Sequence, residues 1–507
     1  MHVLLLTFTL TAIQSATAPA LPPPEIKPHA APTKLTPPSR SDLARAYLRF
    51  EEAFALHPMS GEPLRELNRA FDRATVSFFL GNRGEALRTI DDATYSLVQG
   101  DALAPDRTLM SLVARFDPPT ASVVRNTTAL RATIEPLYLI PSDASRPRPL
   151  RLSLVSPFES GMELARLDVT DWRPDGPPVE FRVSIPELAP ESYALVAGIH
   201  EEAVPTSIAR WDATLEDVAT QRTSNEARAA KLAPVGPPME AALAAFRSRN
   251  AVLARWDAPE RTAFLQWTRE ELLRELVTEL KALEEGRDPY RRRAGDLWRT
   301  VRVGKDGLPV RIFAPPAACT DTRVPLVIAL HGAGGDENMF FDGLGAGKIV
   351  ELAKARGFVV AAPLLGFAGL SGEAFDVLVG ELAFDYAIDP DRIHVVGHSM
   401  GAGAACGLAA RRRERIASVA CFAGGSAPKD GAMAPTRIWA GELDPLAKPE
   451  GLVKLAEKAR ALSAPVECTV VPDYGHTLVV GARLGEALDW LLGHRLGART
   501  EESVPKK

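Results

Sequence analysis

Short apolar runs alternate with amphipathic helical runs along residues 301–492, and few folds accommodate this order. The runs are rich in valine, isoleucine and alanine, which indicates strands buried on both faces, as in parallel sheets. Parallel strands are joined by right-handed helical crossovers. The predicted strands are Val324–Leu330, Phe358–Pro363, Ile393–Gly397, Ser418–Ala423, Thr436–Gly441 and Val466–Pro472, with helical patterns near Lys348, Leu378, Ala404, Leu455 and Leu488. We therefore expect an α/β domain with a mostly parallel, doubly wound sheet.

One strand-to-helix junction carries the pattern Gly-x-Ser-x-Gly. The strand Ile393–Gly397 runs directly into His398-Ser399-Met400-Gly401, and a helix of small residues follows from Ala402. The two glycines allow a sharp turn that raises the serine hydroxyl above the sheet edge. The pattern alone occurs often by chance, but its place after a buried strand indicates chemistry. Ser399 is the predicted nucleophile.

A general base should follow the nucleophile in chain order, and His476 is predicted because it lies in a loop after the last strand. His494 lies in the terminal helix instead. His394 lies inside the nucleophile strand and His398 lies beside the serine, so neither can face the hydroxyl across a site. We interpret His394 and His398 as structural.

The acid that orients the base should come from a loop after an intermediate strand. Asp444, shortly after the strand Thr436–Gly441, is the predicted acid. Glu442, two residues closer to the strand, and Asp473, in the loop of the histidine, remain alternatives. They stay open because a triad is recognised by geometry as well as by order, and the sequence shows only the order.

A tetrahedral intermediate needs backbone N–H donors, and the sequence offers a glycine-rich loop for them. The loop His331-Gly332-Ala333-Gly334-Gly335 follows the strand Val324–Leu330. The predicted donors are the amides of Ala333 and of Met400, the residue after the nucleophile. His331 is interpreted as an anchor of the loop. The spacing of the four cysteines matches no zinc pattern, and we expect neither a metal nor a cofactor.

The N-terminus has the layout of a signal peptide, with an apolar run from Val3 to Ile13 followed by small residues. A retained anchor is the alternative, although the run is shorter than the roughly 20 residues of a spanning helix. We therefore predict a signal peptide at 1–20 and export to the periplasm or the extracellular space. Eight prolines between Pro19 and Pro38 predict an extended linker at 21–40.

Hydrophobic periodicity divides the rest of the chain into further segments. Periodicity predicts a helical unit at 41–117, a small antiparallel β unit at 118–212, a helical segment at 213–299, the α/β domain at 300–495 and a disordered tail at 496–507. No chemical motif occurs between Ser41 and Arg299. A net charge of −5 offers no basic field for nucleic acid, so no nucleic-acid partner is expected. No further stretch has the length of an apolar spanning helix, so no stable membrane insertion is expected after signal removal.

The segment from Thr300 to Gly493 resembles the esterase branch of the α/β-hydrolase superfamily. It is similar to polyhydroxybutyrate-depolymerase-like, feruloyl-esterase-like and prolyl-oligopeptidase-type catalytic domains. The resemblance rests on Leu330–Gly335, Ile388–Ile393 before Gly397–Gly401, Asp444 and Gly475-His476. It implies a serine hydrolase that cleaves small-molecule or polymeric carboxylic esters. The N-terminal half shows no fixed period, so the propeller repeats of prolyl oligopeptidases are absent.

Two other functions stay open: a serine peptidase of prolyl-oligopeptidase type, and a binding protein with an inactive hydrolase scaffold. Only about one helix of sequence separates the strand ending at Pro363 from the nucleophile strand, so we expect no large lid and an open cleft. Apolar residues on loops at the same sheet edge either line an acyl or aromatic pocket or belong to the core. They are Phe340, Phe341, Leu364, Leu365 and Phe367.

Overall fold

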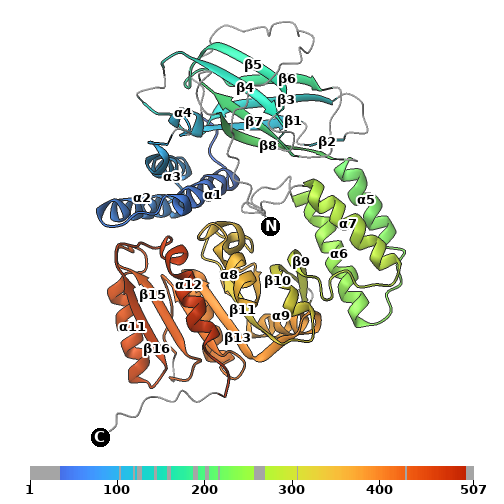
Figure 1. Cartoon of the computed structure of the whole chain (residues 1–507), viewed down its shortest axis with the longest axis vertical. Helices are drawn as coiled ribbons and strands as arrows, with labels where there is room; N and C mark the ends of the chain where they lie inside the picture. Colours follow the sequence, from blue (N-terminus) through green and yellow to red (C-terminus); the bar gives the residue numbers. More distant parts are fainter. Residues whose placement is uncertain are drawn as a thin grey trace. The chain divides into compact units, whose positions relative to one another are not determined.

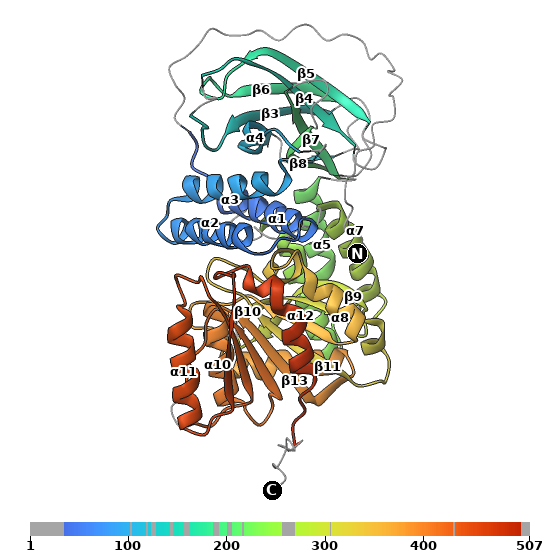
Figure 2. The ribbon, with the colours of Figure 1, turned by 60° about the vertical axis from the view of Figure 1, so that its left-hand side comes forward.

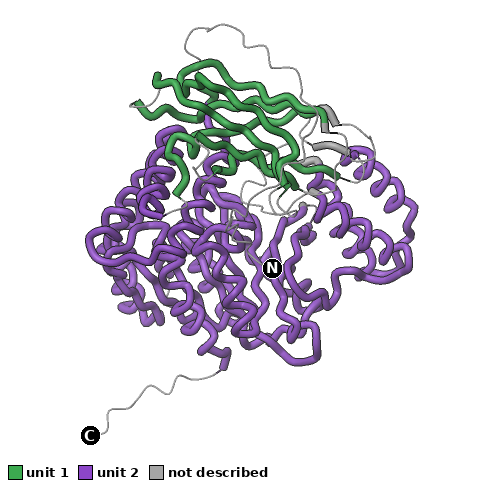
Figure 3. The backbone as a smooth tube through the Cα atoms, turned by 45° about the horizontal axis from the view of Figure 1, so that its top comes forward, with its two compact units in different colours: residues 1–36, 103–216 green, residues 37–102, 217–507 purple. Residues whose placement is uncertain are grey.

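The computed structural model forms two compact units, residues 1–36 with 103–216 and residues 37–102 with 217–507 (Figure 3). It describes residues 35–101, 104–117, 120–122, 128–141, 145–156, 162–185, 192–199, 205–214, 217–255, 269–304, 306–428 and 431–497. The predicted signal peptide and most of the predicted linker and tail lie outside these residues. Among the described helices, none has the length and apolar character needed to cross a membrane.

An eight-stranded sheet organises the larger unit (Figure 1). In spatial order its strands are β9 (Gly295–Val303), β10 (Asp306–Ala314), β12 (Val359–Pro363), β11 (Val324–Leu330), β13 (Ile388–His398), β14 (Ser418–Phe422), β15 (Thr436–Gly441) and β16 (Val466–Val471). The strands from β12 to β16 pair in parallel, whereas β10 pairs antiparallel with both β9 and β12. The prediction of a mostly parallel sheet is confirmed.

Helices cover both faces of this sheet, as its doubly buried strands require (Figure 2). The connecting helices are α8 (Lys348–Arg356), α9 (Gly372–Asp385), α10 (Met400–Arg411), α11 (Pro449–Ala461) and α12 (Val479–Leu492). Apolar residues of α9, α10 and α11 share one core with inward residues of the strands. Helices α8 and α12 pack against each other, and Arg356 donates to the carbonyl oxygen of Gly485 at 3.0 Å.

The hairpin of β9 and β10 was not among the predicted strands, and β9 crosses the predicted boundary at residue 300. Partly buried and exposed residues interrupt the buried ones in β9, so the strand has no continuous apolar run. Both strands also place arginines inside the unit. Arg299 pairs with Asp385 at 2.6 Å, and the fully buried Arg311 donates to Asn338 at 2.7 Å. A search of the sequence for uninterrupted runs of valine and isoleucine therefore does not find this pair of strands.

Three N-terminal helices belong to the larger unit, namely α1 (Arg40–Leu56), α2 (Glu62–Phe79) and α3 (Arg83–Val98). Ser39 caps α1 through a capping box with Asp42. Phe50 of α1 packs on Phe71 of α2 with ring centroids 4.7 Å apart. The predicted helical unit 41–117 is therefore divided, because α4 (Arg107–Met110) and β1 (Leu112–Asp117) fall in the smaller unit.

A second helical group, α5 (Val218–Ala229), α6 (Pro237–Arg255) and α7 (Arg269–Glu284), also belongs to the larger unit. Helix α6 packs against β9. The buried Arg249 of α6 donates to Glu279 of α7 at 3.0 Å and to the carbonyl oxygen of Trp298 in β9. This buried charge therefore ties two helices to the edge of the sheet.

The smaller unit consists of two sheets around its own apolar core. One has the order β1, β3 (Thr128–Pro136), β6 (Val179–Ile185), and the other has the order β2 (Thr120–Ser122), β8 (Thr206–Thr214), β7 (Ser192–Gly198), β4 (Arg148–Val155), β5 (Glu163–Trp172). All described pairings are antiparallel except that of β2 with β8. Leu152, Leu195 and Trp211 lie in the core. The predicted antiparallel β unit is confirmed.

Candidate active site

Ser399 lies in a tight turn between β13 and α10, with φ 54° and ψ −115°. A positive φ is costly for a residue with a side chain, so the surroundings must hold this conformation. The amide of Ser399 donates to the carbonyl oxygen of Phe422 at 2.9 Å. A Cβ atom on Gly397 would lie 2.3 Å from the carbonyl oxygen of Gly401, and one on Gly401 would lie 2.0 Å from that of Leu330. Only glycine therefore fits at these two positions.

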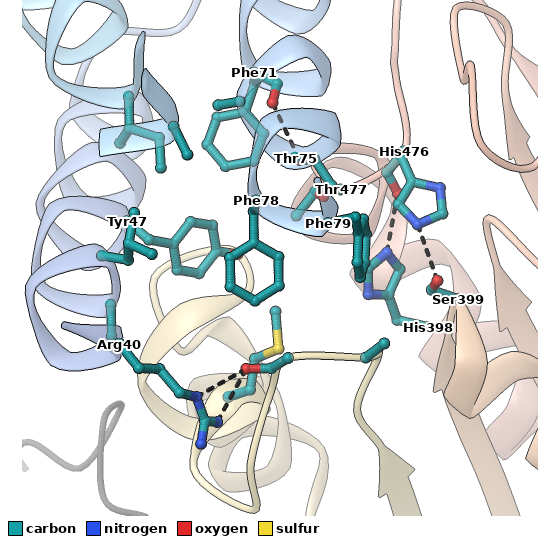
Figure 4. Close-up of a pocket in the computed structure, with 18 residues that line it drawn as sticks. Arg40, Tyr47, Phe71, Thr75, Phe78, Phe79, His398, Ser399, His476 and Thr477 are labelled. Atoms are coloured by element: carbon teal, nitrogen blue, oxygen red, sulfur yellow. Dashed lines mark hydrogen bonds between the residues drawn. The ribbon is translucent and has the colours of Figure 1, made fainter. Parts of the chain in front are cut away.

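Ser399, His476 and Asp444 form a continuous hydrogen-bonded series. The Nε2 atom of His476 lies 2.9 Å from the Oγ atom of Ser399. A dashed line marks this hydrogen bond in Figure 4. On the other side of the ring, Nδ1 lies 2.8 Å from Oδ2 of Asp444. The Asp444 carboxylate is buried, and its Oδ1 accepts from the amides of Leu446 and Ala447, each at 2.8 Å. The loop of Asp444 thus fixes the carboxylate through Oδ1, and the other oxygen, Oδ2, faces the imidazole of His476.

The two alternative acids bind a different residue. Arg65 of α2 donates to Glu442 at 2.9 Å and to Asp473 at 2.7 Å. Of the three carboxylates that the sequence left open, Asp444 is the one that the structure brings to His476.

The other nearby histidines are held in neutral, structural positions. Burial lowers the pKa of His394 and of His398 to about 3, so both rings are uncharged at neutral pH. His398 Nε2 donates to the carbonyl oxygen of His476 at 3.0 Å. His331 accepts from the amide of Leu365 at 2.9 Å, which fixes the start of the glycine-rich loop. Within the described part of the chain, none of the three rings forms a hydrogen bond to Ser399.

The glycine-rich loop packs directly on Ser399. A Cβ atom on Gly332 would lie 3.3 Å from the Cβ atom of Ser399. Ala333 lines the same cavity as Ser399 and His476. Met400 is the first residue of α10, where backbone amides have no intrahelical acceptor. The structure therefore brings both predicted donors to the edge of the sheet where Ser399 lies.

Helix α2 holds the loop of His476, a contact that the sequence analysis missed. The side-chain oxygen of Asn68 accepts from the amide of Gly475 at 2.8 Å, and Oδ1 of Asp72 accepts from the amide of His476 at 2.9 Å. Both side chains are buried. With Arg65 they form a polar stripe at positions i, i+3 and i+7 of a helix. The three polar residues of this stripe were visible in the sequence, but no sequence pattern indicated that they contact the loop of His476.

The carboxyl of Asp72 has an unusual protonation equilibrium. Burial raises the pKa of Asp72 to about 7, and the nearby Asp444 carboxylate also raises it. The hydrogen bond from the amide of His476 acts in the opposite direction and lowers this pKa. Its Oδ2 atom is buried without a hydrogen-bond partner among the described residues. Asp72 therefore exchanges a proton near neutral pH while it remains bound to the loop of His476.

A cavity of about 110 Å³ adjoins Ser399, and helices α1, α2 and α3 form its far wall (Figure 4). Leu43, Phe71, Ala74, Phe78 and Ile90 line that wall. The expectation of an open cleft did not include this wall of helices. It considered only the sequence between neighbouring strands of the sheet, whereas the covering helices come from residues 40–98.

None of the five loop residues proposed for a pocket lines this cavity. Phe340, Phe341 and Leu365 are buried, whereas Phe367 is 96% exposed. Phe340, Phe341 and Leu365 therefore lie in the protein interior, and Phe367 faces solvent.

The glycine of the nucleophile turn gives a stability prediction with a matched control in the same helix. We expect Gly401→Ala to destabilise the fold by at least about 3 kcal/mol, because its Cβ atom would meet backbone. Gly403→Ala, whose Cβ atom would meet nothing within 4 Å, should instead stabilise α10 by about 0.5–1 kcal/mol. Urea unfolding of both variants measures this, and equal effects would contradict the close approach.

Asp72 gives a prediction for the pH dependence of stability. An unfolded aspartate ionises near pH 3.9, roughly, so between about pH 4 and 7 the folded state binds a proton that the unfolded state lacks. The free energy of unfolding therefore falls as pH rises through this range. Asp72→Asn removes the titration, so its Tm relative to the wild type should rise from pH 4 to 7 and then level off. Thermal unfolding tests this, with the exposed Glu66→Gln as control; a Tm difference independent of pH contradicts it.

Comparison with known proteins finds partial matches at low sequence identity. No protein-family model matches the chain. A thermostable esterase is 20% identical over 39% of this chain and 63% of its own, with a TM-score of 0.34. This match spans less than two thirds of that esterase. An S-formylglutathione hydrolase from Agrobacterium tumefaciens is 17% identical over 40% of this chain and 96% of its own, with a TM-score of 0.33. The feruloyl esterase module from Clostridium thermocellum is 12% identical over 42% and 92%, with a TM-score of 0.35.

The fold itself follows from features of this chain. The sheet has one antiparallel hairpin at its edge, six further strands in the order β12, β11, β13, β14, β15, β16, and a serine in a strained turn after β13. Residues 295–492 of this chain therefore have the α/β-hydrolase fold.

Proposed function

We propose that the larger unit is a serine hydrolase that cleaves carboxylic esters through an acyl-enzyme on Ser399. The observation that carries the proposal is the series Ser399, His476 and Asp444, joined at 2.9 and 2.8 Å. A serine hydroxyl is a weak nucleophile by itself, and a base within hydrogen-bond reach activates it. The carboxylate on the far side of the ring supplies the orientation that this base needs.

The reaction proceeds in two balanced steps. Ser399 Oγ attacks the ester carbonyl carbon while His476 Nε2 takes its proton, and the C–O bond breaks as His476 returns that proton to the leaving alcohol. Water then attacks the acyl carbon and gives one proton to His476. The bond between the acyl carbon and Ser399 Oγ breaks as His476 returns that proton to Oγ, which releases the carboxylic acid and regenerates Ser399. Asp444 stabilises the charged imidazole throughout.

The negative charge of each tetrahedral intermediate falls on the former carbonyl oxygen. We assign its stabilisation to the amides of Ala333 and Met400, which come from the two segments that flank Ser399. Loss of one such donor typically lowers turnover by about 100-fold to 1,000-fold. These steps use no cofactor and no metal.

Export to the periplasm or the extracellular space remains part of the proposal. It is supported by the apolar N-terminal run with its small residues and by the proline-rich segment that follows. The substrate would then be an ester outside the cytoplasm.

Ester hydrolysis and the triad are tested together with p-nitrophenyl acetate and a fluorophosphonate probe. We expect Ser399→Ala and His476→Ala to lower kcat on the order of 10⁶-fold and Asp444→Ala on the order of 10⁴-fold. Only Ser399→Ala removes the residue that the probe labels. Glu442→Gln and Asp473→Asn, which alter the carboxylates bound to Arg65, serve as controls and should keep most activity.

Each alternative function has its own outcome. Labelling that survives Ser399→Ala would falsify the nucleophile, and full activity of Asp444→Asn would show that the acid is another residue. Cleavage of peptide p-nitroanilides without ester turnover would favour a peptidase. A wild-type protein that neither reacts with the probe nor hydrolyses either substrate would favour the inactive scaffold.

A further inference from the structure

We propose that the cavity between helices α1–α3 and Ser399 binds a compact, uncharged apolar substituent of the ester. The three-helix segment, residues 40–98, would then select the substrate as part of the active site. This inference rests on the proposed function, because the substituent is placed by reaction of its carbonyl carbon with Ser399. It adds the chemical class of substrate and assigns a role to the N-terminal helices.

The cavity is placed where a group attached to the reacting carbon must lie. Its lining includes Ser399, His476 and Ala333 on one side and residues of the three helices on the other. A substrate carbonyl within bonding distance of Ser399 Oγ therefore directs one of its two substituents toward the helices. In Figure 4 the ring of Phe78 lies between the helices and the nucleophile side of the cavity.

Phe78 connects α2 with the loop of the predicted oxyanion donors. A Cβ atom on Gly334 would lie 2.7 Å from the Phe78 ring, so ring and loop are in close contact. Arg40 of α1 reinforces this closure by donating from two nitrogens to the carbonyl oxygen of Gly334, at 2.9 and 3.2 Å. The wall of the cavity is thus anchored to the site at two points.

The polar side chains in the wall are already bonded elsewhere. The guanidinium of Arg40 binds the Gly334 carbonyl oxygen and lies 3.4 Å from the Asp336 carboxylate. The hydroxyl of Tyr47 donates to Glu51 at 2.6 Å, and that of Thr75 donates to the carbonyl oxygen of Phe71 at 3.1 Å. Among the described residues that line the cavity, an ionic substituent would find no counter-charge available to receive it. Burying such a charge unpaired is strongly unfavourable.

The size of the cavity limits the substituent. Its volume is about 110 Å³, and an apolar cavity of roughly 150 Å³ holds a benzene molecule. A short alkyl chain or one aromatic ring matches this space, whereas a long fatty chain exceeds it. In hydrophobic pockets one methylene changes discrimination by about 10-fold to 200-fold. Discrimination by length should therefore be steep.

Two substitutions in α2 change the cavity in opposite directions. Phe78→Ala should enlarge it, and Thr75→Phe should narrow it, because both residues line it. Leu80→Ala is the matched control, since Leu80 lies at the end of the same helix and is 71% exposed. The assay measures kcat/KM for p-nitrophenyl acetate, butyrate, hexanoate, octanoate and benzoate. A second series of alkyl acetates varies the alcohol instead.

We expect the wild type and Leu80→Ala to favour short or aromatic esters. Phe78→Ala should raise the octanoate-to-acetate ratio of kcat/KM at least about 10-fold, and Thr75→Phe should lower the hexanoate-to-acetate ratio by a similar factor. A shift in the acyl series identifies the acyl group as the occupant, and a shift only in the alcohol series identifies the alcohol. Either result supports the inference.

The failure of this inference differs from failure of the proposed function. If all variants react with the fluorophosphonate probe and hydrolyse acetate while both ratios stay within about 2-fold, the cavity does not bind the substituent and the hydrolase stands. Preference of the wild type for charged substituents would also overturn the inference. A wild type inert toward probe and esters overturns both proposals.

A separate observation supports a second inference: the geometry points to Asn68 and Asp72 as positioning residues for His476. They accept the consecutive amides of Gly475 and His476 at 2.8 and 2.9 Å, from a helix more than four hundred residues away along the chain. The backbone of His476 is therefore fixed by α2, and its imidazole by Asp444. Neither Asn68 nor Asp72 reaches the reacting atoms; each acts through the loop.

The test compares variants that lose the acceptor oxygen of Asn68 or Asp72 with a variant that keeps it. We expect Asp72→Ala and Asn68→Ala to lower kcat for p-nitrophenyl acetate about 10-fold or more with KM within about 2-fold, because a small misplacement of a catalytic group is costly. Asp72→Asn keeps an acceptor oxygen and should retain most of the activity. Arg73→Ala, at an exposed position of α2, is the control.

A purely structural role predicts a different pattern. Asp72→Ala and Asp72→Asn would then have equal kcat, or the loss would disappear once the folded fraction is measured by circular dichroism. Either result overturns the positioning role. Unchanged kcat in the well-folded Asn68→Ala variant overturns it as well, whereas fluorophosphonate labelling of the wild type shows that the hydrolase itself is intact.

Discussion

The backbone of α10 approaches the end of β11 so closely that no side chain fits between them, and the site depends on this contact. A Cβ atom on Gly401 would lie 2.0 Å from the carbonyl oxygen of Leu330. The approach forces the chain to turn sharply after β13, and Ser399 takes the strained positive φ of that turn. The hydroxyl of Ser399 therefore lies at the sheet edge where strands β11, β15 and β16 end and the loops after them begin.

Parallel strands bring their carboxyl ends to one edge, so loops distant in sequence meet there. The loop after β11 carries Ala333, the loop after β15 carries Asp444 and the loop after β16 carries His476. Further hydrogen bonds hold the loops that carry Asp444 and Ala333. Asp444 accepts two amides of its own loop, and His331 anchors the glycine-rich loop through the amide of Leu365. The sheet sets the approximate position of each group, and these bonds set its orientation.

Helices α1–α3 complete the site from outside the sheet. Their polar stripe fixes the loops of Asp444 and His476, and their apolar side chains close a cavity over Ser399. One helix, α2, therefore contributes to both orientation and enclosure. The carboxyl of Asp72, with a pKa of about 7, lies at the junction of the two. Burial of an acidic group beside a histidine loop links stability of the fold to protonation near neutral pH.

Local patterns in the sequence determined the parallel strands, the connecting helices, the nucleophile turn and the candidate residues. Strand burial and tight turns leave periodic apolar runs and glycines at fixed spacing, which a single sequence displays. Chain order also limited the acid to Asp444, Glu442 or Asp473. The antiparallel hairpin of β9 and β10 escaped this reading, because its buried arginines break the apolar pattern.

Only the tertiary structure decided which carboxylate meets His476 and what lies above Ser399. Asp444 lies within hydrogen-bond distance of the His476 ring, whereas Glu442 and Asp473 both bind Arg65 of α2. The covering helices lie more than three hundred residues before the nucleophile. Side-chain periodicity reports which face of a helix is buried, but it carries no information about the partner that buries it.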